Sequence, residues 1–442
     1  MRKYFGTDGI RGVANKHPLT PEFMIKLARS ASNVLPKKNN TILIGRDSRI
    51  SGPMLENALI SGFLSEGREI TLLGVVPTPA ISYLTAKLGF DFGVMISASH
   101  NPVEDNGVKF FNNSGLKLDD SAELEIEKAI ENNSYKTISN IESVRYNPNL
   151  VDYYLEYLLE KSNADLSGMK IICDAAWGAA APWVLQLFTS VGADIVVING
   201  KPNGKYINVD CGSTNTNQLS KFVIESNADL GLAFDGDADR LIAIDENGQE
   251  VDGDGIKYVF ATYLHKHGLL SQKAIVGTVM SNMGLEKALF NKGISLIRTQ
   301  VGDRYVWEEM QKQSINLGGE QSGHIINSDW QKTGDGLLNG LMLASILKTT
   351  KKSLSKSLEE FKKFPQKLIN VEVSDKYKVM EDSELRSLVE DVNKDLVDKG
   401  RLVLRPSGTQ SIIRVMVEAE TMELTDQYVR KVAEKVKSIA KK

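Results

Sequence analysis

The sequence has little cysteine and no long hydrophobic segment, and both absences narrow the class of protein. Only two of the 442 residues are cysteines and no CxxC pair occurs, so a disulfide framework is excluded. The longest apolar run, residues 337–347, is interrupted by polar residues and is shorter than the roughly 20 residues that span a bilayer. The first residues lack the apolar segment of a secretory signal. These features predict a soluble, cytoplasmic protein without a membrane partner.

The chain also lacks a strong net charge and the usual nucleotide-binding fingerprints. Its 53 basic and 56 acidic side chains leave a formal charge of −3, so bulk charge gives no reason to expect nucleic acid as a partner. A phosphate-binding loop or a dinucleotide fingerprint must follow a strand, and the glycine-rich residues 6–12 do not. Hydrophobic residues make up 42% of the chain, which is enough to build several cores.

Short apolar runs alternate with segments of helical period, and this alternation predicts α/β layers. The same order of elements occurs three times, and a smaller α+β unit follows from about residue 365. In each of the three units, the third strand runs into a polar loop: residues 97–102, 235–240 and 318–324. Because ligands bind beyond the carboxyl ends of strands in open α/β sheets, we expect the three loops to face one cleft.

The loop at residues 235–240 carries Asp235, Asp237 and Asp239 directly after an apolar strand. Carboxylates this close repel one another unless a hard cation neutralises them, and oxygen ligands suit Mg²⁺. An EF-hand is excluded, because Arg240 occupies the position where that loop needs glycine and strands flank the segment. A phosphatase that uses Asp235 as its nucleophile remains an alternative from this motif alone.

The loop at residues 97–102 places two serines beside an imidazole. Either Ser97 or Ser99, next to His100, can carry a covalent intermediate if it is activated or already phosphorylated. A phosphoserine and three carboxylates are natural co-ligands for one divalent ion. The same residues also suit an ordinary turn at the end of a strand.

Two further loops carry groups that suit ligand binding. One combines a guanidinium, hydroxyl groups and a glycine that lets backbone amides approach a phosphate, although a plain turn fits the same string. Its residues are Arg405, Ser407, Gly408 and Thr409, with Arg414 downstream. The other offers side chains suited to sugar hydroxyls: Glu320, Ser322 and His324.

Together these loops and the stretch Gly-Thr-Asp-Gly-Ile-Arg-Gly at residues 6–12 resemble the α-D-phosphohexomutase family. The motifs occur in the family's order and span nearly the whole chain. The resemblance implies an α/β fold of three similar mixed-sheet domains plus a smaller C-terminal α+β domain around a central cleft. The implied domains are residues 1–148 with the phosphoserine loop, 149–252 with the metal-binding loop, 253–364 with the sugar-binding loop and 365–442 with the phosphate-binding loop.

The resemblance also assigns roles to individual residues. It implies that Ser99 is the phosphorylated serine and that phospho-Ser99 binds one Mg²⁺ together with Asp235, Asp237 and Asp239. The other implied catalytic residues are Arg11, His100, Lys109 and His324. The implied substrate-binding residues are Arg240, Glu320, Ser322, Arg405, Ser407, Gly408, Thr409 and Arg414. The family usually continues the last motif with Glu-Pro, whereas Gln410 and Ser411 follow here.

Gln321 is typical of the branch of the family that acts on glucosamine phosphates. The implied reaction is the interconversion of glucosamine 6-phosphate and glucosamine 1-phosphate, on the route to UDP-N-acetylglucosamine and the cell wall. It would proceed through a 1,6-bisphosphate intermediate, with glucosamine or glucose 1,6-bisphosphate as the primer. The alternatives are a phosphomannomutase or phosphoglucomutase, a Mg²⁺-dependent sugar-phosphate phosphatase, and a silent phosphosugar-binding protein. The expected partner is a small phosphosugar, and the chain is expected to be a monomer or a homodimer.

Overall fold

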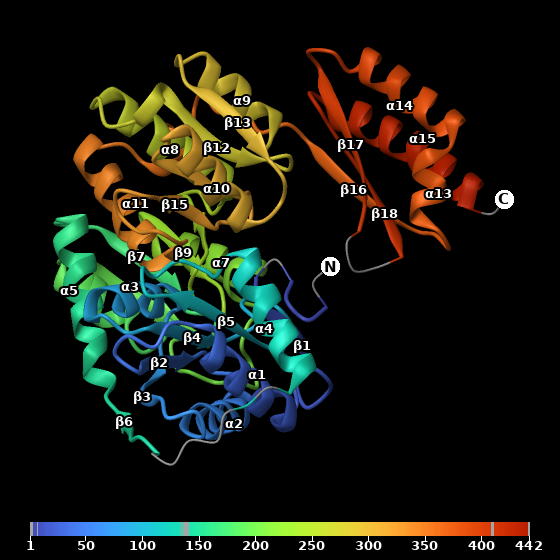
Figure 1. The fold of residues 1–442 in the computed structure, drawn as a ribbon. Helices are drawn as coiled ribbons and strands as arrows, with labels where there is room; N and C mark the ends of the chain where they lie inside the picture. Colours follow the sequence, from blue (N-terminus) through green and yellow to red (C-terminus); the bar gives the residue numbers. More distant parts are fainter. Residues whose placement is uncertain (1–2, 7, 134, 136–140, 408–410, 441–442) are drawn as a thin grey trace. The chain divides into compact units, whose positions relative to one another are not determined.

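The computed structural model describes residues 3–6, 8–133, 135, 141–407 and 411–440, and its contacts divide the chain into two compact units (Figure 1). The first unit comprises Met1–Thr278 and Ile297–Leu358, and the second comprises Val279–Leu296 and Glu359–Lys442. Among the helices in the described ranges, none is long and apolar enough to cross a membrane. The predicted α/β class is confirmed by the sheets, which mix parallel and antiparallel strands and carry helices.

The first sheet has six strands in the order β1-β5-β4-β2-β3-β6. Strands β2, β3, β4 and β6 run parallel, and β5 lies antiparallel between β4 and β1. The strands are β1 (Ile10–Val13), β2 (Thr41–Arg46), β3 (Glu69–Val75), β4 (Phe92–Ile96), β5 (Asp105–Asn112) and β6 (Val144–Tyr146). The accompanying helices are α1 (Pro21–Val34), α2 (Gly52–Leu64), α3 (Thr78–Leu88) and α4 (Asp120–Asn132).

The second sheet has five strands in the order β11-β10-β9-β7-β8. They are β7 (Lys170–Asp174), β8 (Asp194–Ile198), β9 (Leu230–Phe234), β10 (Leu241–Ile244) and β11 (Glu250–Val251). The helices of this region are α5 (Val151–Ser162), α6 (Val184–Ser190) and α7 (Asn217–Ser226). Strands β8, β7 and β9 are parallel, and β10 and β11 form an antiparallel hairpin next to β9.

The third sheet has four strands in the order β13-β12-β14-β15. Its strands are β12 (Ala274–Thr278), β13 (Ser295–Thr299), β14 (Leu317–Gly319) and β15 (Ile325–Asn327). Helices α8 (Gly253–Lys266), α10 (Asp303–Gln313), α11 (Gly336–Thr350) and the short α12 (Leu354–Ser357) complete the first unit.

The second unit is built on a three-stranded antiparallel sheet in the order β16-β18-β17. Its strands are β16 (Gln366–Glu372), β17 (Gly400–Pro406) and β18 (Ile412–Ala419). Its helices are α9 (Met283–Phe290), α13 (Lys376–Glu381), α14 (Ser383–Asp395) and α15 (Met422–Ala440). Valine, leucine and isoleucine side chains from the sheet, α14 and α15 form the core of this unit.

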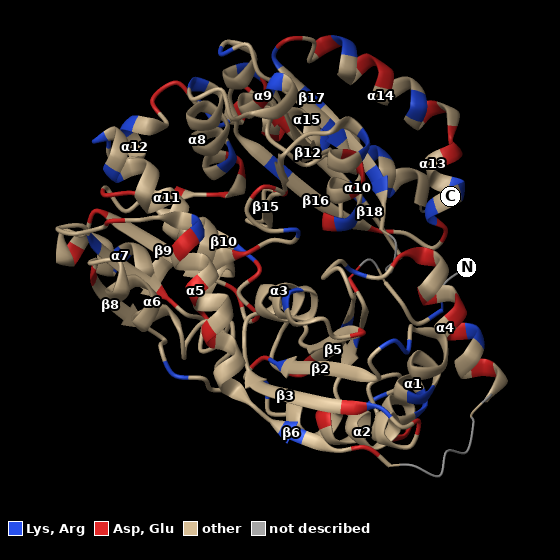
Figure 2. Ribbon diagram, turned by 60° about the vertical axis from the view of Figure 1, so that its left-hand side comes forward, with Lys and Arg blue, Asp and Glu red and all other residues tan. Residues whose placement is uncertain are grey.

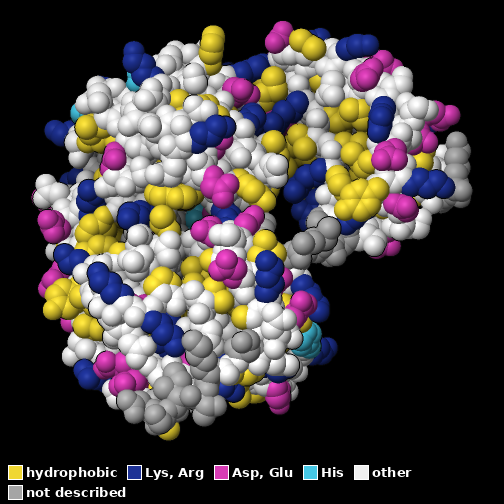
Figure 3. Space-filling view, in the orientation of Figure 1, with side chains coloured by type: hydrophobic (Ala, Val, Ile, Leu, Met, Phe, Trp, Pro, Cys, Tyr) yellow, Lys and Arg dark blue, Asp and Glu magenta, His cyan; other side chains and the backbone are white. Residues whose placement is uncertain are grey.

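Charge is distributed as the amphipathic patterns require. Charged residues gather along helices such as α4 and α14, whereas β2 and β3 are uncharged over most of their length (Figure 2). On the visible face of the first unit, basic and acidic side chains are interspersed (Figure 3). This mixture agrees with the near balance of charge in the sequence.

The predicted change from a buried strand to a polar loop is confirmed in the first three sheets. Strands β4 and β9 are buried at every position, and the loops at residues 97–102 and 235–240 begin at their carboxyl ends. Each of these strands pairs in parallel with a neighbour, and so does β14, which leads into the loop at residues 318–324. Fully apolar strands of this kind are typical of parallel pairs covered on both faces.

The N-terminal segment that leads to β1 is held by one buried carboxylate. Glu127 of α4 accepts hydrogen bonds from the backbone amides of Lys3, Tyr4 and Phe5, at 2.7, 2.6 and 2.8 Å. One turn further along α4, Glu131 is exposed and contacts only the ammonium of Lys3 at 3.4 Å among the described residues. Glu127 therefore positions the segment that precedes β1.

We expect Glu127→Ala to loosen this segment, because three amides lose a charged acceptor and such bonds contribute about 1.5–3 kcal/mol each. Hydrogen exchange at the amides of residues 3–5 should accelerate, and the thermal unfolding temperature should fall. Glu131→Ala is the matched control, since an exposed ion pair contributes at most about 1 kcal/mol. Equal exchange rates in the two variants would contradict the assignment.

Candidate active site

The structure separates the two serines that the sequence left as alternatives. The side chain of Ser97 is buried, and its hydroxyl donates to Asp47 Oδ2 at 2.7 Å and accepts from the amide of Ser99 at 2.8 Å. The Ser99 hydroxyl instead donates to Asp235 Oδ2 at 2.6 Å and lies 3.2 Å from His100 Nδ1. Ser97 is thus engaged in holding the loop, and Ser99 is the serine that faces the carboxylates.

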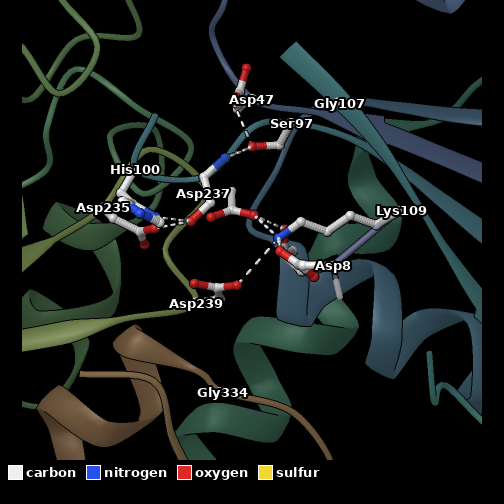
Figure 4. A network of polar contacts seen from close by, with 12 residues as sticks. Asp8, Asp47, Ser97, His100, Gly107, Lys109, Asp235, Asp237, Asp239 and Gly334 are labelled. Atoms are coloured by element: carbon white, nitrogen blue, oxygen red, sulfur yellow. Dashed lines mark hydrogen bonds and ion pairs between the residues drawn. The ribbon is translucent and has the colours of Figure 1, made fainter. Parts of the chain in front are cut away.

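The three aspartates after β9 form a buried cluster whose ligand oxygens lie within 4.8 Å of one another. Asp235 accepts from Ser99 and, at 3.2 Å, from the amide of Arg240. Asp237 Oδ2 accepts from Thr78 Oγ1 at 2.5 Å and from the ammonium of Lys109 at 2.8 Å. Figure 4 shows Lys109 reaching toward this cluster from β5.

The cluster fits a hard divalent cation. Asp237 Oδ1 and Asp239 Oδ1 are buried and have no hydrogen-bond partner among the described residues. Burial of a carboxylate oxygen without a partner is costly, and a cation removes that cost. With the adjacent Asp235 and the Ser99 oxygen, these atoms form the all-oxygen donor set that Mg²⁺ prefers.

The three carboxyl groups are held in different electrostatic states. Burial, together with the neighbouring charges of Asp239 and Asp237, raises the pKa of Asp235 well above its usual range. Burial also opposes ionisation of Asp239, but the ammonium of Lys109 and the imidazole of His324 outweigh it and hold the pKa of Asp239 well below its usual range. Burial and like charges thus dominate at Asp235, whereas basic groups dominate at Asp239.

Six side chains form a closed ring of alternating acidic and basic groups next to this cluster. In order they are Asp239, Lys109, Asp8, Lys117, Asp303 and His324, which returns to Asp239. Lys109 lies 3.3 Å from Asp239 and 3.0 Å from Asp8. The ring joins β5, the loop after β9 and the start of α10.

The ring fixes the charge of Lys109. Burial alone would lower its pKa, but the carboxylates of Asp237, Asp8 and Asp239 outweigh burial and raise the pKa well above the ordinary value. The same ion pairs with Lys109 and Lys117 overcome burial and lower the pKa of Asp8 well below its usual range. Lys109 therefore acts as a fixed positive charge and is a poor proton acceptor at neutral pH.

The two histidines of the site differ in their protonation. Burial, with the positive charges of Arg240 and Arg11, lowers the pKa of His100 to about 3, so this ring is neutral at pH 7. Burial also disfavours charge on His324, but Asp239 and Asp303 outweigh it and raise its pKa. His324 Nε2 accepts from the amide of Gly334 at 3.0 Å, so in its neutral form the ring carries its proton on Nδ1, toward Asp239.

Two guanidinium groups retain donors toward the site. Arg11 donates to Asp8 and, at 3.2 Å, to Asn101 Oδ1. The Nε atoms of both Arg11 and Arg240 are buried and form no hydrogen bond in the described part of the chain, although Arg240 Nε lies 3.9 Å from Asp239 Oδ1. Such donors suit an anionic ligand.

The third loop presents a mixture of engaged and accessible groups. Glu320 Oε1 accepts from the amide of Gly302 at 2.9 Å, and Ser322 is partly exposed. The side-chain amide of Gln321 donates through Nε2 to Asp252 Oδ2 at 3.1 Å, and Asp252 is the residue that caps the N-terminus of α8. Gln321 thus contacts the scaffold of its own loop.

The predicted phosphate loop belongs to the second unit. Arg405 on β17 and Arg414 on β18 are directly opposite in the antiparallel register. Burial and the charge of Arg414 lower the pKa of Arg405. The ammonium of Lys376 donates to the carbonyl of Ser407. Gly408 and Thr409 lie outside the described residues.

Sequence reasoning gave no role to several residues that the structure brings to the site. They are Asp8, Asp47, Arg49, Thr78, Lys117, Asn208 and Asp303. Asp47 and Arg49 follow the carboxyl end of β2, so the criterion that selected the other loops would also have selected theirs. Lys117 and Asp303 had no such signal.

Family models match four successive parts of the chain. Phosphoglucomutase/phosphomannomutase α/β/α domains I, II and III match residues 2–137, 152–248 and 252–364, and the C-terminal domain of the same family matches residues 368–435. The chain therefore belongs to the phosphoglucomutase/phosphomannomutase family, the α-D-phosphohexomutases.

Curated relatives of this chain are named for one activity within the family. The chain is 51% identical to the phosphoglucosamine mutase of Lactobacillus johnsonii, with 99% of this chain and 98% of the relative covered. It is 49% identical to the phosphoglucosamine mutase of Bacillus subtilis, with 99% of each covered.

Solved structures share the fold at low sequence identity. A phosphoglucomutase/phosphomannomutase family protein from Burkholderia thailandensis has a TM-score of 0.81 at 22% identity, with 100% of this chain and 98% of that one covered. The N-acetylphosphoglucosamine mutase of Aspergillus fumigatus, solved in complex with GlcNAc-6P and magnesium, has a TM-score of 0.64 at 18% identity, with 100% and 96% covered.

We expect Asp237→Asn to weaken divalent-cation binding by at least about tenfold, because it removes charge from an oxygen that has no other partner. Binding of Mn²⁺ as a probe, measured by electron paramagnetic resonance, tests this without turnover. Asp174→Asn is the control, since Asp174 is also a buried aspartate of the second sheet but bonds to scaffold amides. Equal affinities in the two variants would argue against the assigned metal site.

Proposed function

We propose that this chain interconverts glucosamine 6-phosphate and glucosamine 1-phosphate, the activity named by its relatives at about 50% identity. The product would feed the synthesis of UDP-N-acetylglucosamine. The observation that carries the mechanism is the Ser99 hydroxyl, 2.6 Å from Asp235 in a buried carboxylate cluster that fits Mg²⁺. Phosphorylated Ser99, one Mg²⁺ and a sugar 1,6-bisphosphate primer are parts of this proposal.

The reaction consists of two transfers, and each moves a different phosphoryl group. In the first, the free hydroxyl of the sugar forms the new P–O bond, the bond from phosphorus to Ser99 Oγ breaks, and the hydroxyl gives up its proton. The bisphosphate then turns over. Ser99 Oγ forms a bond to the phosphorus of the other phosphoryl group, the bond from that phosphorus to the sugar oxygen breaks, and the sugar oxygen regains a proton. Phosphoryl transfer needs positioning and positive charge more than covalent chemistry from the protein.

The side chains divide these tasks according to their charge states. Lys109 and Arg11 supply fixed positive charge, since the surrounding carboxylates raise the pKa of both groups. Bound Mg²⁺ would add charge neutralisation at Ser99. His324 is the residue assigned to accept the sugar proton, and its acceptor Nε2 would then exchange the amide of Gly334 for the sugar hydroxyl. Neutral His100 is a hydrogen-bonding partner of Ser99 Oγ.

The remaining assignments concern substrate binding. We assign contacts with the sugar to Glu320 and Ser322, and Arg240 to the reacting phosphate. The non-reacting phosphate is assigned to the C-terminal loop: Arg405, Ser407, Gly408, Thr409 and Arg414. The four-domain division at residues 148, 252 and 364 and a monomeric or homodimeric state belong to the same proposal.

No observation favours the alternative phosphatase, in which Asp235 would be the nucleophile. One oxygen of Asp235 accepts from Ser99 and the other from the amide of Arg240.

A turnover panel tests the substrate. With Mg²⁺ and a trace of glucose 1,6-bisphosphate, kcat/KM for glucosamine 6-phosphate should exceed that for glucose and mannose 6-phosphates by at least about tenfold, the discrimination that one polar group supplies. A preference for a plain hexose would refute the amino-sugar assignment and keep the mechanism. Release of inorganic phosphate without isomer would refute the mutase proposal.

Serine substitutions test the carrier. Ser99→Ala should lose turnover by at least about a thousandfold, as removal of a nucleophile does, and should take up no phosphoryl group by intact mass. Ser97→Ala should keep a measurable fraction of activity and remain phosphorylated, because Ser97 only holds the loop. The reverse pattern would assign the phosphoryl group to Ser97.

A further inference from the structure

One buried guanidinium binds the backbone of the Ser99 loop. Arg49 is fully buried, and its side chain donates to four carbonyl groups between β4 and the start of β5. The acceptors are the carbonyls of Ser99 at 2.9 Å, Asn101 at 2.7 Å, Asp105 at 2.8 Å and Pro102. A planar guanidinium with five donors is suited to fix several carbonyls in one geometry.

A second arm of the same network reaches the amide of Ser99. The backbone amide and Nε of Arg49 donate to Asp47 at 2.9 and 3.0 Å. Asp47 accepts from the hydroxyl of Ser97, which in turn accepts from the amide of Ser99. The carbonyl and the amide of Ser99 are therefore both tied to Arg49, one directly and one through two side chains.

This double restraint acts on a residue in an uncommon backbone conformation. Ser99 has a φ of +54°, in the left-handed region that non-glycine residues rarely adopt. Such a conformation is strained and persists only where the surroundings determine it. Here it accompanies the approach of Ser99 Oγ to Asp235.

Residues from loops of the second sheet also contact the carbonyl of Ser99. Asn208 Nδ2 donates to the Ser99 carbonyl at 2.9 Å. Gly236, between two of the clustered aspartates, approaches so closely that an added Cβ would lie 2.6 Å from that oxygen. Arg49 and Asn208 thus hold one carbonyl from the loops of two different sheets.

We propose that Arg49 is a positioning residue for phosphoryl transfer: by binding the loop at both backbone groups of Ser99, it sets the distance between the phosphoryl carrier and the metal-binding aspartates. The inference rests on the proposed function, in which Ser99 is the carrier. Arg49 itself contacts no reacting atom. It fixes the geometry on which the rate of transfer depends.

A matched control distinguishes positioning from stability. Arg68 is another fully buried guanidinium of the same sheet region, and it donates to the carbonyls of Ser32, Leu35 and Pro36 and to Asp91. Arg49→Lys and Arg68→Lys each replace a buried fork by a single ammonium. Comparison of Tm, kcat and KM in the two full-length variants separates a loss of fold from a loss of alignment.

We expect Arg49→Lys to lower kcat by about 10- to 100-fold with KM within about threefold, since displacements near 1 Å have effects of this size on transfer. Arg68→Lys should keep kcat within about twofold despite a comparable fall in Tm. Equal losses of kcat in the two variants, or an unchanged kcat in Arg49→Lys, would overturn the inference.

Asn208→Ala is the second variant, because it removes one bond to the Ser99 carbonyl and leaves Arg49 in place. It should lower kcat several-fold without a matching change in KM, and an unchanged kcat would count against the inference if Arg49→Lys does not fold.

Failure of the proposed function would be seen differently, as absence of isomerisation in the unsubstituted protein. Intact mass after incubation with glucose 1,6-bisphosphate shows separately whether Ser99 is the carrier.

Discussion

The close approach of three carboxylates on one short loop is the constraint on which the rest of the site depends. Their ligand oxygens lie within 4.8 Å in a buried place, where charges are poorly screened. Burial and the charges of Asp239 and Asp237 raise the pKa of Asp235. Asp237 and Asp239 share the ammonium of Lys109, and Asp239 stays ionised. Two carboxylate oxygens of the loop still have no hydrogen-bond partner in the described chain, and a bound cation would satisfy them.

The same constraint links the site to the stability of the first unit. Lys109 comes from the first sheet and the aspartates from the second, so a buried ion pair joins the two. A buried ammonium is tolerated only where carboxylates face it, and removal of one partner leaves the other uncompensated. Because those carboxylates keep Lys109 protonated, it is a source of positive charge. In the proposed function the proton passes instead to His324, which contacts Asp239.

The sequence predicted the loops because their positions follow from local rules. A buried apolar strand that ends in polar residues marks the carboxyl edge of a sheet, and Ser99 was found by this rule. The choice between Ser97 and Ser99 needed the structure, or a family resemblance, because both are serines of one turn. The rule was not applied to Arg49, which it would have selected. Lys117 and Asp303 join the ring through tertiary packing of segments far apart in the chain, and no local pattern reports that contact.

The second unit has an electrostatic imbalance of the opposite sign. Arg405 and Arg414 are directly opposite in the sheet, where like charges destabilise a cross-strand pair. The ammonium of Lys376 reaches the carbonyl of Ser407 in the same region. Partial burial and the facing charge lower the pKa of Arg405, which is the cost of holding two guanidinium groups together. A phosphate bound by both groups would remove that cost, and a ligand that binds the folded state alone stabilises it. In the proposed function, the stability of this unit and the binding of the non-reacting phosphate would therefore depend on the same pair of residues.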